Sequence, residues 1–151
     1  TGFRVTDLLT PMTVIGEQGR DLNQVWAERV EAFLGTTVSG FPNVFMLMGP
    51  NTGLGHNSMV FMIEAQVNYA LRCMDAVQKR GARALDVAKN TQDAFKQRVM
   101  KRLRRSVWST GCQSWYLDDR GYNPTVWPGF TFEFWLKTRR ITATDYRFIQ
   151  S

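Results

Sequence analysis

The sequence predicts an α/β fold, and three consecutive stretches carry that prediction. Residues 41–48 are almost all apolar, which is the pattern of a strand covered on both faces. Residues 49–55 contain three glycines, so the backbone there must turn sharply or let another molecule approach it closely. From about residue 58 to residue 80, apolar residues recur at helical spacing. A strand, a glycine-rich turn and a long helix therefore form the centre of the predicted fold.

Length and composition limit the class of protein. A chain of 151 residues with 44% hydrophobic content has the size and the apolar material of one ordinary domain. No apolar run approaches the roughly 20 residues that span a bilayer, so we expect a soluble protein without a membrane segment. Cys73 and Cys112 form no CxxC pair and have no histidine at ligand spacing, which argues against a metal site and fits a reducing cytoplasm. Thr1 stands where an initiator methionine is expected, so we expect a piece of a longer protein.

The elements beside this centre follow from local signals. Asp21 can cap a short helix over residues 21–29, and residues 31–38 return to an extended pattern. Asn57 or Ser58 is the expected N-cap of the long helix. The residues of this helix that we expect to face the sheet are Val60, Ile63, Val67, Ala70, Leu71, Met74 and Val77.

After Gly81 terminates the long helix, the chain alternates again between strand and helix. Residues 83–88 form a predicted short strand. Asn90 is the expected cap of a second amphipathic helix, which extends to about Arg105. The core side of this helix is expected to consist of Phe95, Val99 and Leu103.

The last third of the chain is rich in aromatic residues, most of which we expect in the core or lining a cleft. The turn sequence Asp-Asp-Arg-Gly at residues 118–121 predicts a β-hairpin formed by residues 114–117 and 122–127. We interpret its two carboxylates as turn formers rather than as a catalytic acid and base. Residues 130–140 are interpreted as a helix, with a strand as the alternative.

The net charge of +6 has a local source in the second helix. Its six cations are Lys96, Arg98, Lys101, Arg102, Arg104 and Arg105. We interpret them as a solvated helix face, which is the commoner role of such a run. The alternative is a non-enzymatic basic module that binds nucleic acid through this helix and exposed aromatic rings, with an affinity that falls steeply with salt.

The glycine-rich turn has two interpretations. Main-chain N–H groups at a helix N-terminus stabilise negative charge, so the turn is compatible with a bound dinucleotide. Residues 53–58 resemble GxGxxG, but Ser58 occupies the last position and no strand with a ribose-binding acid follows. The glycines could equally serve the tight turn of their own backbone. His56, the one histidine, is interpreted as a residue that holds this turn rather than one that transfers protons.

Five short motifs carry a resemblance to a known family. They are Thr1-Gly2-Phe3, Gly40-Phe41-Pro42-Asn43, Gly49-Pro50-Asn51-Thr52-Gly53-Leu54-Gly55-His56, Gly111-Cys112-Gln113-Ser114-Trp115-Tyr116 and Trp127-Pro128-Gly129. Together they resemble the C-terminal part of the FAD- and NADPH-dependent flavoprotein monooxygenases, the Baeyer-Villiger-like group. Two GxGxxG motifs, the FxGxxxHxxxW signature and the catalytic arginine of that family are absent, and the resemblance implies that they lie upstream of Thr1.

The resemblance implies a partial dinucleotide-binding fold of the FAD-domain type, with a C-terminal helix, hairpin and aromatic-rich extension. Residues 1–82 would be the C-terminal portion of an FAD-binding domain, and residues 83–151 would line the cofactor and substrate cleft. The helix N-terminus would face the flavin near its pyrimidine edge. The implied cofactor-binding residues are Gly49, Pro50, Asn51, Thr52, Gly53, Leu54, Gly55 and Trp115, the last of them near the ribose of the nicotinamide cofactor.

The resemblance also implies what the complete protein does. It would use FAD and NADPH to insert one oxygen atom from O2 into an organic substrate, converting a ketone to an ester or oxidising a heteroatom. The missing N-terminal part of the same protein would be the partner of this chain, which alone should neither hold FAD tightly nor turn over. A piece of an α/β fold should expose apolar surface where the missing parts belong, so we expect it to self-associate.

Overall fold

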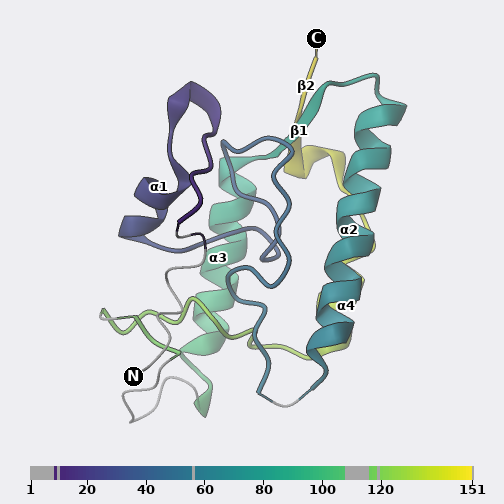
Figure 1. The fold of residues 1–151 in the computed structure, drawn as a ribbon. Coiled ribbons are helices and arrows are strands. Elements are labelled where there is room, and N and C mark those ends of the chain that lie inside the picture. Colours follow the sequence, from purple (N-terminus) through teal and green to yellow (C-terminus); the bar gives the residue numbers. More distant parts are fainter. Residues whose placement is uncertain (1–8, 10, 56, 108–115, 119, 151) are drawn as a thin grey trace.

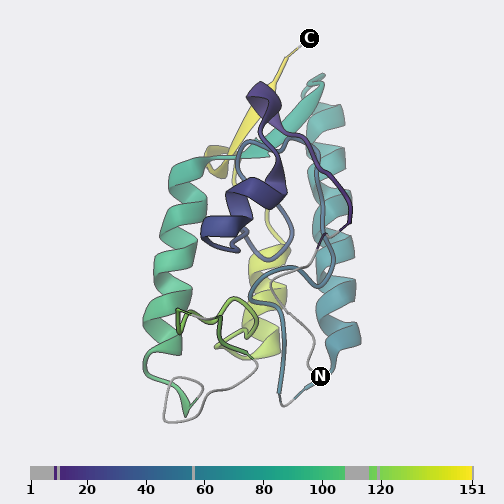
Figure 2. The same ribbon diagram turned by 60° about the vertical axis from the view of Figure 1, so that its left-hand side comes forward.

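The computed structural model describes residues 9, 11–55, 57–107, 116–118 and 120–150, and within these ranges it contains four α-helices and a two-stranded sheet. The elements are α1 (Leu22–Glu28), α2 (Met59–Lys79), β1 (Ala84–Val87), α3 (Lys89–Leu103), α4 (Thr131–Thr138) and β2 (Tyr146–Ile149). Figures 1 and 2 show α2, α3 and α4 along the length of the molecule, with the sheet at one end. The prediction of a mixed α/β chain is confirmed at this level. None of the described helices is long and apolar enough to cross a membrane.

The sheet is an antiparallel pair that also fastens a distant loop. Val87 of β1 lies opposite Tyr146 of β2, and Asp86 lies opposite Arg147. The Asp86 carboxylate accepts a hydrogen bond from the main-chain N–H of Gly40 at 2.9 Å and lies 2.9 Å from the Arg147 guanidinium. Arg147 also contacts Glu17 at 2.5 Å. The predicted strand at residues 83–88 is therefore confirmed, and its buried carboxylate ties the sheet to the loop before the glycine-rich turn.

The main core is aromatic. Phe33 packs edge-on against Phe95 with ring centroids 5.3 Å apart, and Trp127 packs edge-on against Phe134 at the same separation. Tyr69 of α2 is fully buried in the same cluster. Edge-to-face packing is a preferred arrangement of aromatic rings, and it stabilises the core beyond the effect of the apolar area that is buried. Rings from the last third of the sequence therefore supply part of the core, as predicted.

The helix boundaries agree with most of the predicted signals. Asp21 caps α1 by accepting a main-chain N–H two residues later, at 2.9 Å. Ser58 is the N-cap of α2, and Gly81 follows its end with φ +59°, a conformation that glycine adopts without strain. The predicted cap of α3 is wrong, because the helix already begins at Lys89 and its N-cap is Ala88, so Asn90 lies inside the first turn.

The other predictions for α3 and α4 hold, whereas the hairpin prediction does not. Phe95, Val99 and Leu103 are the buried apolar side of α3, and α4 confirms the helix interpretation of residues 130–140. No described residue of 116–118 or 120–127 belongs to a strand, and residues 114 and 115 lie outside the described residues.

Asp118 acts as a turn former, as predicted. Its carboxylate accepts the main-chain N–H groups of Arg120 at 2.9 Å and Tyr122 at 2.8 Å. This is a local turn in which a side-chain oxygen replaces a strand partner as hydrogen-bond acceptor. Asp119 lies outside the described residues.

The strand predicted at residues 41–48 is wrong. The segment is irregular, and its main-chain donors find separate acceptors: Asn43 bonds to the carbonyl of Leu85 at 3.0 Å, and Met46 to that of Thr36 at 2.8 Å. A strand requires a neighbouring strand for its hydrogen bonds, and β1 uses β2 for this purpose. An apolar run shows that a segment can be buried, but it does not supply the partner.

The extended pattern predicted at residues 31–38 is also wrong, because the chain folds back on itself there. The main-chain N–H of Phe33 donates to the carbonyl of Thr37 at 2.8 Å, and the residues between them form a tight turn. Leu34 and Gly35 both have positive φ, 52° and 58°. The apolar side chains of this stretch are buried, so hydrophobicity was a correct signal of burial but not of conformation.

The predicted core face of α2 is mostly wrong. Of the seven residues expected to face the sheet, only Ala70 is buried. Four of them are exposed, namely Val60 (63%), Val67 (39%), Leu71 (56%) and Met74 (52%). The buried face instead carries Met62, Ala65, Gln66, Tyr69, Ala70, Cys73 and Ala76. The helix is apolar on two sides, and periodicity alone does not tell which side packs in this chain.

Gln66 joins α2 to two loops. Its side chain is fully buried, and its Nε2 donates to the carbonyl of Gly35 and to the hydroxyl of Thr36, both at 2.9 Å. Its Oε1 accepts from the main-chain N–H of Met48 at 3.0 Å. A buried amide with this many partners is stabilising only while all of them remain in place.

We predict that Gln66→Leu lowers the free energy of unfolding of the chain by about 1–3 kcal/mol, because the buried carbonyl of Gly35 loses its hydrogen-bond donor. Urea-induced unfolding followed by circular dichroism measures this difference. The matched control is Gln78→Leu, the same change at an exposed position of the same helix, which should alter the unfolding free energy by less than about 0.5 kcal/mol. Equal losses in both variants would contradict the role given to Gln66.

A second prediction concerns pH. Burial raises the pKa of the Asp86 carboxyl above its ordinary value of 3.8, although Arg147 and the N–H of Gly40 oppose the shift. An acid whose pKa is higher in the folded state stabilises the fold below its unfolded pKa, and this contribution is lost as the pH rises through the folded pKa. The unfolding free energy of the wild type minus that of Asp86→Asn should therefore fall as the pH is raised from 3 upward. If the wild type instead gains stability relative to Asp86→Asn as the pH rises from 3, the raised pKa of Asp86 is contradicted.

A third prediction concerns the exposed apolar side of α2. If this surface drives self-association, replacing both Leu71 and Met74 with glutamate should shift the 151-residue chain toward the monomer, as measured by analytical ultracentrifugation over a range of concentrations. The control carries the same two added charges on exposed polar positions of α2, Asn68→Glu with Gln78→Glu, and should associate like the wild type. A wild-type chain that is monomeric at every concentration would refute the expectation.

Candidate functional site

The glycine-rich turn lies at the end of the molecule where two helices begin. Figure 1 shows the starts of α2 and α4 at the same end, opposite the sheet. The two starts are joined directly, because the Asn57 side-chain amide donates to the Thr131 hydroxyl at 3.0 Å. Helix N-termini carry partial positive charge on their unpaired N–H groups. Two of them therefore converge beside residues 49–55.

The first half of the turn is held by a segment that lies far away in the sequence. Asn51 has φ +57°, and its main-chain N–H donates to the carbonyl of Pro124 at 2.6 Å. Its side-chain amide donates to the carbonyls of Asn123 at 2.9 Å and Val126 at 3.2 Å. The Thr52 hydroxyl closes the turn on the carbonyl of Gly49 at 2.7 Å.

Gly53 continues this attachment as a parallel bridge with Val126. Its N–H donates to the carbonyl of Thr125 at 2.8 Å, and its own carbonyl accepts from the N–H of Trp127 at 2.9 Å. A Cβ at Gly53 would lie 2.9 Å from the Thr125 carbonyl oxygen, and one at Gly49 would lie 2.3 Å from that of Gly35. Both glycines are thus required by contacts of the chain with itself. At these two positions the structure supports the interpretation that the glycines serve the tight turn of their own backbone.

The second half of the turn is accessible to a ligand. Gly49, Pro50, Asn51 and Thr52 are buried, whereas Gly53 and Leu54 are half-buried and Gly55 is exposed. Within the described ranges, the main-chain N–H groups of Leu54 and Gly55 donate to no acceptor. These two groups, next to the start of α2, are the part of the predicted site that can bind an electron-rich atom. Trp115 and His56 lie outside the described residues.

Two buried polar residues that the sequence did not single out, Gln66 and Asn123, lie beside the turn, with exposed fractions of 0% and 4%. The Gln66 side chain accepts the main-chain N–H of Met48, just before the turn, and the carbonyl of Asn123 accepts the side-chain amide of Asn51. The Asn123 side chain accepts the N–H groups of Thr125 and Val126 and so shapes the segment that holds the turn. One signal for Gln66 was present, since it is an amide within a largely apolar stretch of helix. Asn123 gave no comparable signal, because its contact with the turn joins positions 72 apart in the chain.

The side chains whose pKa values burial raises most lie outside residues 49–55. Burial raises the pKa of the Cys73 thiol to about 12, and it raises the pKa values of Tyr69 and Tyr146, whose hydroxyls share a hydrogen bond. These groups remain protonated at neutral pH and act as neutral packing residues. Among the described residues no cluster of three or more histidine, cysteine or acidic side chains could hold a metal ion.

Comparisons with known proteins bear on this arrangement. No family model matches the sequence. The chain is 47% identical over 148 residues to a Baeyer-Villiger monooxygenase of Pseudomonas aeruginosa, and 45% identical over 152 residues to a Baeyer-Villiger monooxygenase of Streptomyces coelicolor. These alignments cover 97% and 99% of this chain but 28% and 29% of the two relatives. The chain therefore spans less than a third of the length of the curated relatives that it matches.

Solved structures show the same likeness at the level of the fold. The structure of cyclohexanone monooxygenase from Rhodococcus sp. Phi1 bound to NADP+ matches 100% of this chain and 29% of that chain, with a TM-score of 0.83 and 21% sequence identity. A steroid monooxygenase bound to NADP matches 92% of this chain with a TM-score of 0.79. The high sequence identity to the curated relatives and the agreement of the folds show that this chain belongs to the Baeyer-Villiger monooxygenase family.

Proposed function

We propose that the protein containing this sequence is an FAD-dependent, NADPH-using monooxygenase that inserts one oxygen atom from O2 into a small organic substrate. Within it, this chain would form the last part of a dinucleotide-binding FAD domain, residues 1–82, and an extension that lines the cofactor and substrate cleft, residues 83–151. The observation that carries the proposal is the pair of accessible N–H groups of Leu54 and Gly55, at the meeting point of α2 and α4. The relatives, two of them Baeyer-Villiger monooxygenases, agree with it.

The residues present fit the pyrimidine edge of a flavin. FAD supplies the redox chemistry when bound, and its pyrimidine edge gains negative charge on reduction. The N–H groups of Leu54 and Gly55 would donate to that edge, and the N-terminus of α2 would stabilise the added charge. The other predicted contacts, from Gly49 to Gly53, would act mainly by holding these two groups in position. Trp115 remains the proposed side chain beside the ribose of the nicotinamide cofactor.

The substrate class is proposed by analogy with solved relatives. Cyclohexanone monooxygenase has been solved with cyclohexanone and with ε-caprolactone, a ketone and the ester made from it. A small ketone is therefore the proposed substrate, with oxidation of a heteroatom as the alternative outcome. We also propose a cytoplasmic location, which fits the buried, free thiol of Cys73.

Nucleic-acid binding is not retained as a second function. Of the six cations, four lie on α3, and Arg104 and Arg105 follow its end. Two of the four have carboxylate partners, since Lys96 pairs with Glu31 and Arg102 pairs with Glu133. The remaining cations are exposed, which fits the solvated surface that we inferred.

The proposal predicts that Gly55→Asp lowers the flavin content of the full-length protein. A carboxylate at this exposed position would compete for the N–H groups of the turn and repel the negative charge of the reduced flavin. FAD content is measured from the absorbance of the purified protein, together with NADPH oxidation in the presence of a ketone. Gln78→Asp, near the opposite end of the same helix, introduces the same charge at an exposed position far from the turn, and should retain flavin.

Two outcomes would contradict the proposal. A full-length protein that binds no FAD and does not oxidise NADPH when FAD is added would refute the flavin monooxygenase function itself. Equal flavin content in Gly55→Asp and Gln78→Asp would refute the role of the turn but leave the function standing.

A further inference from the structure

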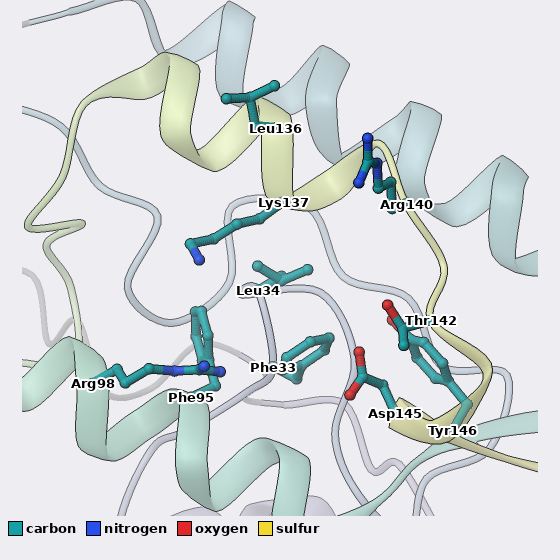
Figure 3. A pocket seen from close by; sticks show the side chains of 10 residues that line it. All are labelled: Phe33, Leu34, Phe95, Arg98, Leu136, Lys137, Arg140, Thr142, Asp145 and Tyr146. Carbon is teal, nitrogen blue, oxygen red and sulfur yellow. The ribbon is translucent and has the colours of Figure 1, made fainter.

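A concave region lies between α3, α4 and the segment that leads to β2, and no residue of the glycine-rich turn lines it. It consists of two pockets of about 230 and 240 Å³. Both pockets are lined by Phe95, Arg98 and Lys137, so they form one groove that is divided at these residues. Figure 3 shows the first pocket, in which side chains from α3 and α4 face each other.

The floor of this groove is aromatic and well packed. Phe95 is 4% exposed and contacts Phe33 edge-on at one end of the groove. At the other end its ring lies nearly parallel to that of Trp127, with an angle of 13° and centroids 6.3 Å apart. The ring of Tyr146, also buried, continues the floor in the first pocket. Burial fixes these rings, so the small part of each that reaches the groove is a preformed apolar surface.

The sides of the groove are strongly basic. Arg98 and Lys137 line both pockets, and Figure 3 shows Lys137 extending from α4 into the space above Phe95 and Arg98 lying along α3 beside Phe95. The other charged residues of the first pocket are Arg140, whose guanidinium points away from these two in Figure 3, and Asp145. Within the part of the chain that the structure describes, Arg98, Lys137 and Arg140 form no ion pair. Because Arg98 and Lys137 line the same groove and neither is paired with a carboxylate of a described residue, a bound anion would supply the counter-charge.

We propose that this groove binds a small organic carboxylate whose apolar part is one aromatic ring system or a short acyl chain. The carboxylate would lie between Arg98 and Lys137, where an arginine can bind both oxygens. The apolar part would rest on Phe95, in one or other pocket. Each pocket is smaller than the roughly 300–1,000 Å³ of sites for drug-sized ligands, which excludes a whole dinucleotide. An inorganic anion would leave the aromatic floor uncovered.

The test uses the full-length, FAD-loaded protein and 2-naphthoate as the probe, titrated by isothermal calorimetry. Its neutral counterpart, 2-naphthylmethanol, has the same rings without the charge and should bind at least about ten-fold more weakly. Lys137→Met and Arg98→Met should each weaken naphthoate binding by about ten-fold or more, whereas Lys137→Arg should retain it. Flavin content confirms that each variant is folded.

Arg105→Met is the matched control, because it removes one positive charge just beyond the end of α3, at an exposed position that does not line the groove. It should bind naphthoate like the wild type. Two results with the wild type would overturn the proposal: no saturation by naphthoate below about 10 mM, or equal affinity for naphthoate and for 2-naphthylmethanol. Two results with the variants would also overturn it: unchanged naphthoate affinity in Lys137→Met, or equal losses of naphthoate affinity in Arg98→Met and Arg105→Met. None of these results depends on turnover, so the groove can fail while the proposed function stands.

Discussion

The structure depends on the buried side chain of Gln66. Because its amide binds Gly35, Thr36 and the N–H of Met48, one residue of α2 fixes both the tight turn at residues 33–37 and the entry to the glycine-rich turn. Residues 41–48 have no strand partner among the described residues, and their position rests on isolated hydrogen bonds of this kind. Burying a primary amide is costly unless all of its hydrogen-bond partners are present. The two loops can therefore pack against α2 in this arrangement only, since any other would leave the Gln66 amide unpaired.

The glycine-rich turn divides into a part held by the protein and a part open to a ligand. Asn51 and Gly53 are hydrogen-bonded to residues 123–127, and this attachment fixes the direction of the next two residues. The N–H groups of Leu54 and Gly55 are therefore oriented before anything binds, so binding would not have to order them. A requirement of the backbone and the proposed contact with a cofactor are therefore compatible, since the first would position the groups that make the second.

The sequence predicted the helices well and the irregular segments poorly. Helix signals are local: Asp21, Ser58 and Gly81 mark ends through contacts within a few residues. The failures at residues 31–48 and on α2 have a different cause, because burial depends on which partner segment is present. Gly49 and Gly53 were recognised, but their reason was not, since Gly35 and Thr125 approach them from distant parts of the chain. Short motifs identified the family because they preserve chemistry that spacing alone does not explain.

The two candidate sites suit different kinds of negative charge. At the turn, Leu54 and Gly55 offer main-chain dipoles and no cationic side chain, which can stabilise a partial or transient charge without holding a strong anion when the charge is gone. In the groove, Arg98 and Lys137 offer full charges above an apolar floor, and these suit an anion that is permanently ionised. The two sites approach each other at Trp127, which lines the second pocket of the groove and donates its main-chain N–H to the carbonyl of Gly53 in the turn. A ligand in the groove would therefore have two routes to the turn: through Trp127, and through α4, whose first residue, Thr131, bonds to Asn57 beside the turn.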